Sequence, residues 1–503
     1  MSTAAPDNDK RPRVAEPSLL DAIVPMASLV VLIGGSLALF GLDALDGPIQ
    51  VALLLCAAIA ALVALKNGHS WDDVQRAGQG ALSSITSAMF ILLAVGALIG
   101  VWNLSGTIPT LVYYGIEVLS PTWYYAATAL ICGAIAMSIG SSWTTAGTIG
   151  VGLVGVATML GVSPEITAGA VISGAYLGDK LSPLSETTVL TAQMVEVDVH
   201  EHIRRQAWTS VPAFAIAFVV LLVIGLVDGP DVHNPVGEEI ELRSLGDIYW
   251  ITPLNLLPLV LLAYLSIRKV PATLALLAST LFAGVLGAIL QPSVMEAFVG
   301  GADYNGVLGS IKGVWSAMAN GYEIDSGIGL IDQLLSRGGM DSMLTTLWLI
   351  IGAVTFGALL EEFGLIGRLI DPLVRAARST GRLFASVFAC GFGLNLVAGD
   401  QYIALVLPSR VFRAEFRQRG LAATNLSRLA ADSGTVTSAL VPWNSCGAFM
   451  GAVLGVATLS YLPYAIFNYA SPALSVLYGI TGFKIERTAV RADPARTGPA
   501  ARG

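Results

Sequence analysis

The sequence predicts an all-α polytopic membrane protein, built as an inverted repeat of five transmembrane helices plus one re-entrant hairpin per half, with discontinuous helices. Of 503 residues, 54% are hydrophobic and only 12% are charged, whereas soluble domains carry about 25% charged residues. Apolar runs of about 17–25 residues, long enough to span a bilayer, recur along the whole chain. The two halves also repeat the same landmarks in the same order. This composition argues against a large soluble enzyme.

The apolar segments define the predicted domain organisation. They fall at residues 19–41, 48–66, 81–102, 122–161, 164–195, 206–227, 250–267, 271–290, 342–361, 382–413, 422–458 and 460–481. We expect a cytoplasmic N-terminal tail (1–18), a first transmembrane repeat (19–227), an extracellular linker (228–249), a second repeat (250–481) and a cytoplasmic C-terminal tail (482–503). No cleavage site follows the first apolar run, so we interpret it as an uncleaved helix and not as a signal peptide.

Four of these segments are too long for one pass and are interrupted by Gly, Ser, Thr, Pro or Asp: 122–161, 164–195, 382–413 and 422–458. Short loops rich in Lys and Arg are usually cytoplasmic. All loops of this kind lie on the same side of the membrane if segments 122–161 and 382–413 are re-entrant hairpins, which enter and leave the membrane on one side. Their tips are then at 140–144 and 395–400. This arrangement leaves about ten spanning helices in the cell membrane, with both termini cytoplasmic.

Matching landmarks relate the two halves of the chain. Pro25 corresponds to Pro258, Pro48 to Pro271, Cys132-Gly133 to Cys390-Gly391, and Pro183 to Pro442. Because each half has an odd number of spans, five, the second half starts on the opposite side of the membrane, and the repeat is inverted. Paired interrupted segments in such inverted repeats indicate the binding site. Between helix and hairpin, residues 107–119 and 365–378 are predicted to form amphipathic helices at the membrane interface.

The first interrupted segment contains a polar cluster at residues 178–188. Gly178 and Pro183 break the helix there, which frees backbone carbonyls. The candidate ion- and proton-binding side chains at this break are Asp179, Ser182, Ser185, Glu186 and Thr187. Carboxylates within a membrane are costly and usually functional, and hard cations such as Na⁺ prefer oxygen ligands. The alternative is a cytoplasmic loop, in which these residues would be ordinary.

The second interrupted segment has the same construction of small and hydroxylated residues, one carboxylate, a proline and a polar cap. Its candidate ion- and proton-binding residues are Asp432, Ser433, Thr435, Thr437 and Asn444. A Ser/Thr-rich packing surface between helices would explain the hydroxyls but not Asp432. We therefore expect Asp179 and Asp432 to be the metal ligands, with Na⁺ as the metal.

The hairpin tips supply a further polar group. The first tip contains Ser141, Ser142, Thr144 and Thr145, and the second contains Asn395 and Asp400. Half-helix ends at such tips direct partial charge toward an ion, unless the tips are exposed to solvent. Lys180 is expected either to neutralise Asp179 or to extend to water. All four histidines are placed in loops, and all four cysteines are expected to be buried without forming disulfides.

Three stretches resemble the signature sequences of the NhaC-type Na⁺/H⁺ antiporters. They are "SGAYLGDKLSPLSETTVL" (173–190), "GDQYIALVLPSRVF" (399–412) and "NLSRLAADSGTVTSALVPWNSCGAFM" (425–450). The resemblance implies a secondary transporter, often a dimer, with site residues at the positions already named in these stretches. One departure is Glu186, where the family commonly has Asp. The family also includes exchangers of organic acids, so the resemblance does not fix the substrate.

The leading hypothesis is exchange of Na⁺ for H⁺ by alternating access, with carboxylates at the broken helices binding cation and proton competitively. The expected partners are Na⁺, H⁺ and the lipid bilayer, without a cofactor and without nucleic acid, because no dense basic tract is present. The second hypothesis is exchange of organic anions, such as malate for lactate, or of amino acids, with Lys180 or Arg410 contacting the substrate carboxylate. An enzyme, a channel and an ATP-driven pump are disfavoured because no nucleophile–base set, pore ring or P-loop is found.

Overall fold

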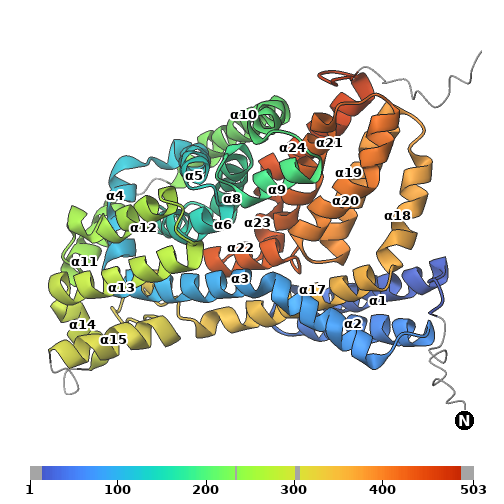
Figure 1. Ribbon diagram of the computed structural model, residues 1–503. Coiled ribbons are helices and arrows are strands. Elements are labelled where there is room, and N and C mark those ends of the chain that lie inside the picture. The colour runs from blue at the N-terminus through green and yellow to red at the C-terminus, as the bar shows by residue number, and fades with distance from the viewer. Residues whose placement is uncertain (1–13, 233–234, 301–305, 489–503) are drawn as a thin grey trace, which may run out of the picture.

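The computed structural model describes residues 14–232, 235–300 and 306–488, which fold almost entirely into helices (Figure 1). No β-strand occurs within these ranges. In the described part of the chain, eight helices are long and apolar enough to cross a membrane: Leu19–Asp46, Pro48–Lys66, Trp71–Leu104, Pro121–Ile139, Val199–Val227, Ala272–Leu290, Asp341–Glu362 and Thr380–Val397. Two bent helix pairs, with bends of 87° and 91°, raise the number to ten if each is one span. The chain is an all-helical, multi-pass membrane protein.

The helices follow the predicted apolar segments closely along most of the chain. Their bounds are α1 Leu19–Phe40, α2 Pro48–Lys66, α3 Trp71–Leu104, α4 Thr107–Val118, α5 Tyr124–Ile139, α6 Ser142–Thr145, α7 Val151–Met159, α8 Pro164–Leu181, α9 Glu186–Met194, α10 Val199–Val232, α11 Pro235–Ile248, α12 Leu257–Ile267, α13 Ala272–Leu290, α14 Pro292–Val299, α15 Val307–Asn320, α16 Gly329–Leu335, α17 Leu344–Glu362, α18 Leu365–Ala376, α19 Thr380–Val397, α20 Gln401–Gln418, α21 Ala423–Ala430, α22 Ser445–Leu454, α23 Thr458–Tyr461 and α24 Ile466–Thr481.

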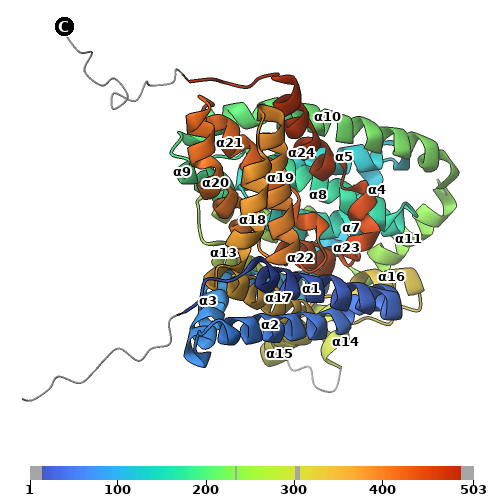
Figure 2. The same cartoon turned by 90° about the vertical axis from the view of Figure 1, so that its right-hand side faces the viewer.

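The helices form two parts that are visible in both views. A layer of long helices contains α1, α2, α3, α13, α15 and α17, and these helices contact one another in sequence-distant pairs such as α3 with α13 and α2 with α17 (Figures 1 and 2). Above this layer lies a body that contains the interrupted helices, from α5 to α10 and from α19 to α24. The layer helix α3 contacts both parts, since it packs on α17 and on α22.

All four interrupted segments are broken where the sequence predicts. The segment 122–161 turns at Gly140, which has a φ of 80°, and 382–413 turns at Gly399, which has a φ of 63°. A side chain is strained at such angles, so glycine permits both turns. The other two segments break at 182–185, after α8, and around 441–444, before α22.

Two helices extend beyond their predicted apolar cores. The helix α3 starts at Trp71 instead of residue 81, because Ser70 caps it and its charged first turns are exposed. The helix α10 begins at Val199 instead of 206. The placement of all histidines in loops is therefore wrong: His202 is helical and fully buried, with its Nδ1 atom 2.8 Å from Ser427 Oγ. One histidine, His233, lies outside the described residues.

Other expectations agree with the structure. The predicted amphipathic segments 107–119 and 365–378 form α4 and α18. The four cysteines are buried and free. The segment 228–249 is helical over most of its length, as the end of α10 and as α11, and its place as an extracellular linker stays a prediction. Small residues permit close packing in the body: a Cβ atom on Gly174 of α8 would lie 2.1 Å from the carbonyl oxygen of Ala129 in α5.

Candidate functional site

The break after α8 places Asp179 at the end of a half-helix. A Cβ atom on Gly178 would lie 2.4 Å from the carbonyl oxygen of Gly133, so glycine lets α8 approach α5 at this point. The next half-helix, α9, starts at the cap Ser185, whose hydroxyl accepts from the Thr188 N–H at 3.3 Å. The Thr188 hydroxyl lies within hydrogen-bond distance of the carbonyl oxygens of Asp179 (3.3 Å) and Lys180 (3.2 Å). This side chain therefore spans the break.

The first hairpin tip contacts Asp179 directly. Ser142 donates to the Asp179 carboxylate from its hydroxyl at 2.7 Å and from its backbone N–H at 3.3 Å. Its neighbour Ser141 caps the short helix α6, accepting from the Thr144 N–H at 3.1 Å. The Thr145 hydroxyl donates to the Ser141 carbonyl at 2.9 Å. The tip is thus internally fixed, and Asp179 is its partner across 37 residues of sequence.

The second hairpin tip presents Asp400 as the cap of α20. Its carboxylate accepts from the backbone N–H groups of Tyr402 at 2.6 Å and Ile403 at 3.2 Å. The carbonyl oxygen of Gly399 accepts from the Ser445 N–H at 2.8 Å, at the start of α22. Each hairpin tip therefore contacts the helix break that lies in the same half of the chain.

A cavity of about 310 Å³ lies where these elements meet. Its lining includes three carboxylates (Asp179, Glu186 and Asp400) and hydroxyls of Ser141, Ser142 and Thr187. Among the residues described as lining it there is no Lys or Arg. In the described ranges, no three His, Cys, Asp or Glu side chains converge closely enough to hold one metal ion together. An ion here would therefore be held by fewer than three of these side chains, with hydroxyl and carbonyl oxygens completing its ligands.

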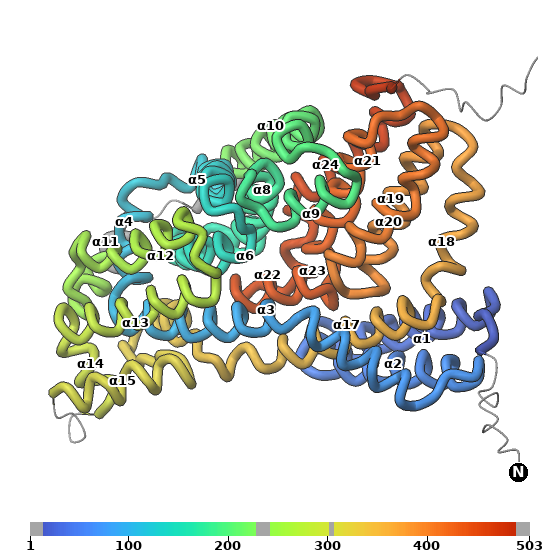
Figure 3. Tube along the Cα trace, viewed as in Figure 1, coloured from blue at the N-terminus to red at the C-terminus, as the bar shows by residue number. Residues whose placement is uncertain are grey.

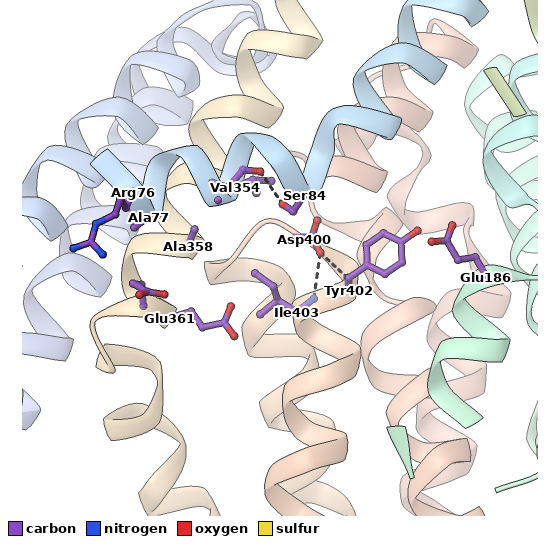
Figure 4. Close-up of a pocket in the computed structure, with 13 residues that line it drawn as sticks. Arg76, Ala77, Ser84, Glu186, Val354, Ala358, Glu361, Asp400, Tyr402 and Ile403 are labelled. Carbon is purple, nitrogen blue, oxygen red and sulfur yellow. Dashed lines mark hydrogen bonds between the residues drawn. The ribbon is translucent and has the colours of Figure 1, made fainter. Parts of the chain in front are cut away.

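A second, wider cavity of about 800 Å³ adjoins the first, since both are lined by Ser84, Glu186, Asp400 and Tyr402. Figure 4 shows Asp400 and Glu186 on opposite sides of the Tyr402 ring. The wider cavity continues past Glu361 to the exposed side chain of Arg76. It connects the carboxylates to the surface of the protein.

The asparagines of the second half form a closed network beside the cavity. Asn395 donates to the Gly434 carbonyl at 2.7 Å and to the Thr437 hydroxyl at 2.9 Å. Asn444, the cap of α22, donates to the Asn395 side-chain oxygen at 3.1 Å and accepts from the Cys446 N–H at 3.0 Å. All of these side chains are buried. They hold the second break in place, and none of them lines either cavity.

Asp432 lies in a different environment from Asp179. It forms a buried ion pair with Lys180 and accepts hydrogen bonds from the hydroxyls of Ser471 at 2.6 Å and Thr209 at 3.1 Å. Lys180 thus neutralises Asp432 and not its sequence neighbour Asp179. Asp432 lines neither cavity.

The remaining predicted residues have local partners. The Ser433 hydroxyl donates to the Ala430 carbonyl at 3.2 Å, and the buried Thr435 hydroxyl has no partner in the described structure. The Ser182 hydroxyl accepts from the Leu184 N–H at 3.2 Å, and the hydroxyls of Ser185 and Thr187 lie 3.0 Å apart. Of these five, only Thr187 lines the smaller cavity.

Comparison with known proteins identifies the family to which the chain belongs. A model of the Na⁺/H⁺ antiporter family matches residues 19–226 and 174–483, which together cover most of the chain. The chain belongs to the Na⁺/H⁺ antiporter family. The resemblance of its motifs to NhaC-type antiporters is therefore confirmed: the Na⁺/H⁺ antiporter NhaC of Alkalihalophilus pseudofirmus is 36% identical over 87% of this chain and 91% of that protein.

Other relatives, with a similar sequence identity to this chain, are named for the exchange of other substrates. The malate-2H⁺/Na⁺-lactate antiporter of Bacillus subtilis is 34% identical, over 87% of this chain and 90% of that protein. The arginine/ornithine antiporter ArcD of Halobacterium salinarum is 32% identical, over 95% of this chain and 94% of that protein. Membership thus identifies a membrane antiporter but leaves its cargo to be argued from the site.

Sequence reasoning missed the residues of this candidate site that come from α3, and Tyr402 of α20. Ser84, Ser87 and Ala88 of α3 line the smaller cavity, as do Gln401 and Tyr402 of α20. The α3 positions lie three and four residues apart, which places them on one helix face. The sequence feature that could have indicated these positions is the pair Ser84 and Ser87, two polar residues on one face of an otherwise apolar helix.

Proposed function

We propose that the protein exchanges Na⁺ for H⁺ across the cell membrane by alternating access. The observation that carries the proposal is the smaller cavity, which gathers Asp179, Glu186 and Asp400 without a Lys or Arg among its described lining residues. A site lined by carboxylates and hydroxyls favours a cation, and Na⁺ prefers oxygen ligands of this kind. Family membership supports antiport.

Competition at Asp179 would couple the two ions. Its carboxylate accepts two hydrogen bonds from Ser142, and the remaining lone pairs face a cavity that a cation can enter. A proton on this carboxylate removes the charge that attracts Na⁺, and Na⁺ displaces the proton. One site that holds either ion, but not both, exchanges them without further machinery.

The proposal includes the membrane topology. We propose two inverted repeats, each with five spans and one re-entrant hairpin, and cytoplasmic termini. Supporting this, Gly140 packs against Leu184 and Ser185 in the first half, as Gly399 packs against Trp443 and contacts Ser445 in the second. The wider cavity reaches Arg76, near the start of α3. The sequence predicts that this Lys- and Arg-containing stretch after α2 is cytoplasmic, so the cavity is proposed to be open inward. A homodimer is proposed from the family resemblance alone, and crosslinking in membranes tests it.

A second candidate is exchange of a cationic amino acid. The wider cavity of about 800 Å³ is large enough for an organic substrate and is lined by Glu361 and Glu362 as well as Asp400. An organic anion is less well supported, because Lys180 is paired with Asp432 and Arg410 lines neither cavity.

Proteoliposomes with an imposed pH gradient test the proposal. Dissipation of the gradient is measured after addition of Na⁺, K⁺, arginine, malate or lactate in turn. Proton movement on Na⁺ addition, without a response to malate or lactate, is the expected result. A response to arginine and none to Na⁺ would replace the proposal with the second candidate, and a response to malate alone would contradict both.

A further inference from the structure

A group of four exposed arginines lies in the body where α18 ends, α19 begins and α24 ends. It consists of Arg375 in the last turn of α18, Arg378 between α18 and α19, Arg382 in the first turn of α19 and Arg487 after α24. Helix α19 packs against both α18 and α24 (Figure 3). None of the four arginines lines either carboxylate cavity. We call these four residues the arginine cluster.

The arginine cluster lines two neighbouring surface pockets. The α19/α24 pocket has a volume of about 600 Å³ and contains Arg382 and Arg487. The α18/α19 pocket has a volume of about 610 Å³ and contains Arg375, Arg378 and Arg382. Arg382 and Ala385 line both pockets. Among the described lining residues of the two pockets there is no Asp or Glu, so both pockets favour an anion.

The arginine cluster lacks the carboxylate partners that other arginines on the same predicted side of the membrane have. Such ion pairs join Arg368 to Glu16, Arg413 to Glu196 and Arg419 to Glu415. In the described ranges, no ion pair joins a residue of the cluster to a carboxylate.

Two acidic residues lie close to the cluster in the sequence but do not neutralise it. Asp371 precedes Arg375 by four residues and lines neither pocket. Glu486 precedes Arg487 and pairs instead with Arg205. Like charges that share a pocket repel one another, so an anion from outside the described structure would stabilise the cluster.

Backbone hydrogen bonds position Arg487 at its pocket. The chain turns at Gly482, which ends α24 with a φ of 74°. Arg487 then forms an isolated antiparallel β-bridge with Leu421. The N–H of Thr488 donates to the carbonyl oxygen of Gly420 at 2.9 Å. The protein therefore holds this part of the cluster in place by its own backbone contacts.

Both pockets lie at the ends of membrane helices. The helix Thr380–Val397 is long and apolar enough to span a membrane, and Arg382 is in its first turn. Helix α24 ends at Thr481, which lines the α19/α24 pocket. The ends of spanning helices lie near the lipid headgroups. Lipid phosphates are therefore the anions nearest to the cluster.

Each pocket joins its arginines to apolar surface. The apolar lining residues are Ile480 and Ile485 in the α19/α24 pocket, and Leu373, Ala376 and Ala389 in the α18/α19 pocket. Ala385 and Ala389 lie four residues apart on one face of α19 and lead from Arg382 along the helix. A free anion would use the arginines alone, whereas a ligand with an anionic head and an apolar chain would use both surfaces.

We propose that the arginine cluster binds the headgroup of an anionic phospholipid of the cytoplasmic leaflet. Arginine binds phosphate oxygens through paired N–H donors, and basic pockets between helices on the cytoplasmic side suit lipid headgroups. Arg382, which lines both pockets, contacts the phosphate, and the acyl chains follow the apolar surface beside α19. Helix α18 connects α17 of the layer with α19 of the body, so the bound lipid holds this connection to the body.

Lipid binding to the purified full-length protein in detergent tests the inference, measured by native mass spectrometry with phosphatidylglycerol and with phosphatidylcholine. The Arg378→Gln/Arg382→Gln double variant should bind phosphatidylglycerol about 25-fold more weakly than the wild type, since each arginine near a headgroup contributes about fivefold. Binding of the zwitterionic phosphatidylcholine should be weak in both proteins. A wild type that binds the two lipids equally, or a double variant with unchanged affinity for phosphatidylglycerol, would overturn the inference.

The matched control is the Arg204→Gln/Arg417→Gln double variant. It removes the same charge from two exposed arginines that line neither pocket and are also predicted to be cytoplasmic. We expect this variant to bind phosphatidylglycerol as tightly as the wild type. An equal loss of affinity in both double variants would show that overall charge governs binding, which would contradict a defined site.

Ala385→Trp keeps every charge and covers the case in which the arginine variant does not fold. The exposed Ala385 lines both pockets, and an indole there would clash with a bound headgroup, so the affinity for phosphatidylglycerol should fall by about tenfold or more. An unchanged affinity would contradict the inference. Inorganic phosphate is the remaining probe: binding as tight as that of phosphatidylglycerol would assign the pockets to a free anion and overturn the lipid site.

Discussion

In the proposed exchange, the contact between Asp179 and Ser142 affects whether the Asp179 carboxylate holds a proton or Na⁺. The Ser142 hydroxyl lies 2.7 Å from the carboxylate and stabilises its charged form. Because the hydroxyl belongs to a hairpin tip and the carboxylate to a helix break, this bond also joins two separate elements of the body. Removing it should therefore change proton competition without removing the site.

The first prediction concerns Ser142→Ala. Loss of a donor to a carboxylate favours the protonated form, so the pH optimum of Na⁺-driven exchange should rise by about one unit. Transport in proteoliposomes across a range of pH measures it. Ser138→Ala is the matched control, since that exposed hydroxyl only donates to the Ala134 carbonyl within α5. A fall in rate at every pH, with the optimum unmoved, would mean that Ser142 has no part in proton competition.

The second prediction concerns Asp432→Asn. We expect loss of Na⁺-dependent proton movement, together with a stability loss of about 3–5 kcal/mol, because Lys180 is left charged in a fully buried place. Thermal unfolding in detergent measures the second effect. Adding Lys180→Gln should restore most of the lost stability, and a double variant as unstable as the single one would contradict the ion-pair explanation.

At the residue scale, the sequence singles out Asp179, Glu186 and Asp400 as carboxylates at breaks in apolar segments, and the structure places all three beside one cavity. Their binding of Na⁺ and H⁺ stays a prediction. The sequence does not predict that Asp432 pairs with Lys180, because 252 residues separate them. Asp432, predicted to bind Na⁺, lies beside α24 and lines neither cavity, and its role as an ion ligand stays a prediction. Only the packing of both halves brings these two charges together.

At the scale of elements, close helix packing depends on glycine. Gly174 of α8 faces the backbone of α5, and a methyl group there would overlap the Ala129 carbonyl. We predict that Gly174→Ala destabilises the protein by about 1–3 kcal/mol through overpacking. Gly393→Ala in α19 is the control, since its added methyl group would meet nothing within 4 Å. Thermal unfolding compares the two, and equal stability would show that α5 and α8 can separate without cost.

The breaks in the helices could be predicted because glycine and proline have direct backbone consequences. The true lengths of α3 and α10 could not be predicted from apolar content. Charged and polar residues such as Asp72 and His202 continue a helix beyond its apolar core when a cap or a buried polar partner is available. For α3 the cap is Ser70, and for α10 the polar partner is Ser427, which no local pattern indicates.

At the scale of the whole molecule, the layer and the body meet at the carboxylate cavity. The helix α3 contributes Ser84 from the layer, while Asp179 and Asp400 come from the body. Relative movement of these two parts would open and close the cavity, which is the kind of change that alternating access requires. The inverted repeat and the orientation in the membrane stay predictions.

Orientation can be measured with single cysteines. The four native cysteines are buried, so background labelling by a membrane-impermeant thiol reagent should be low. Asp72→Cys, in an exposed position of the first turn of α3, should react only from the cytoplasmic side, and Asp325→Cys, also exposed, only from outside. Labelling of both from the same side would contradict the proposed topology.

Na⁺-driven proton movement in proteoliposomes tests the central claim most directly, with wild type, Asp179→Asn and Asp72→Asn compared in one preparation. Asp72 is exposed and lines neither cavity. The predicted result is that the wild type and Asp72→Asn change the pH inside the vesicles in the direction set by the Na⁺ gradient, with protons moving opposite to Na⁺. The pH change with Asp179→Asn should equal that of vesicles without protein. Exchange by Asp179→Asn at the wild-type rate would contradict the assignment of the cavity as the ion site.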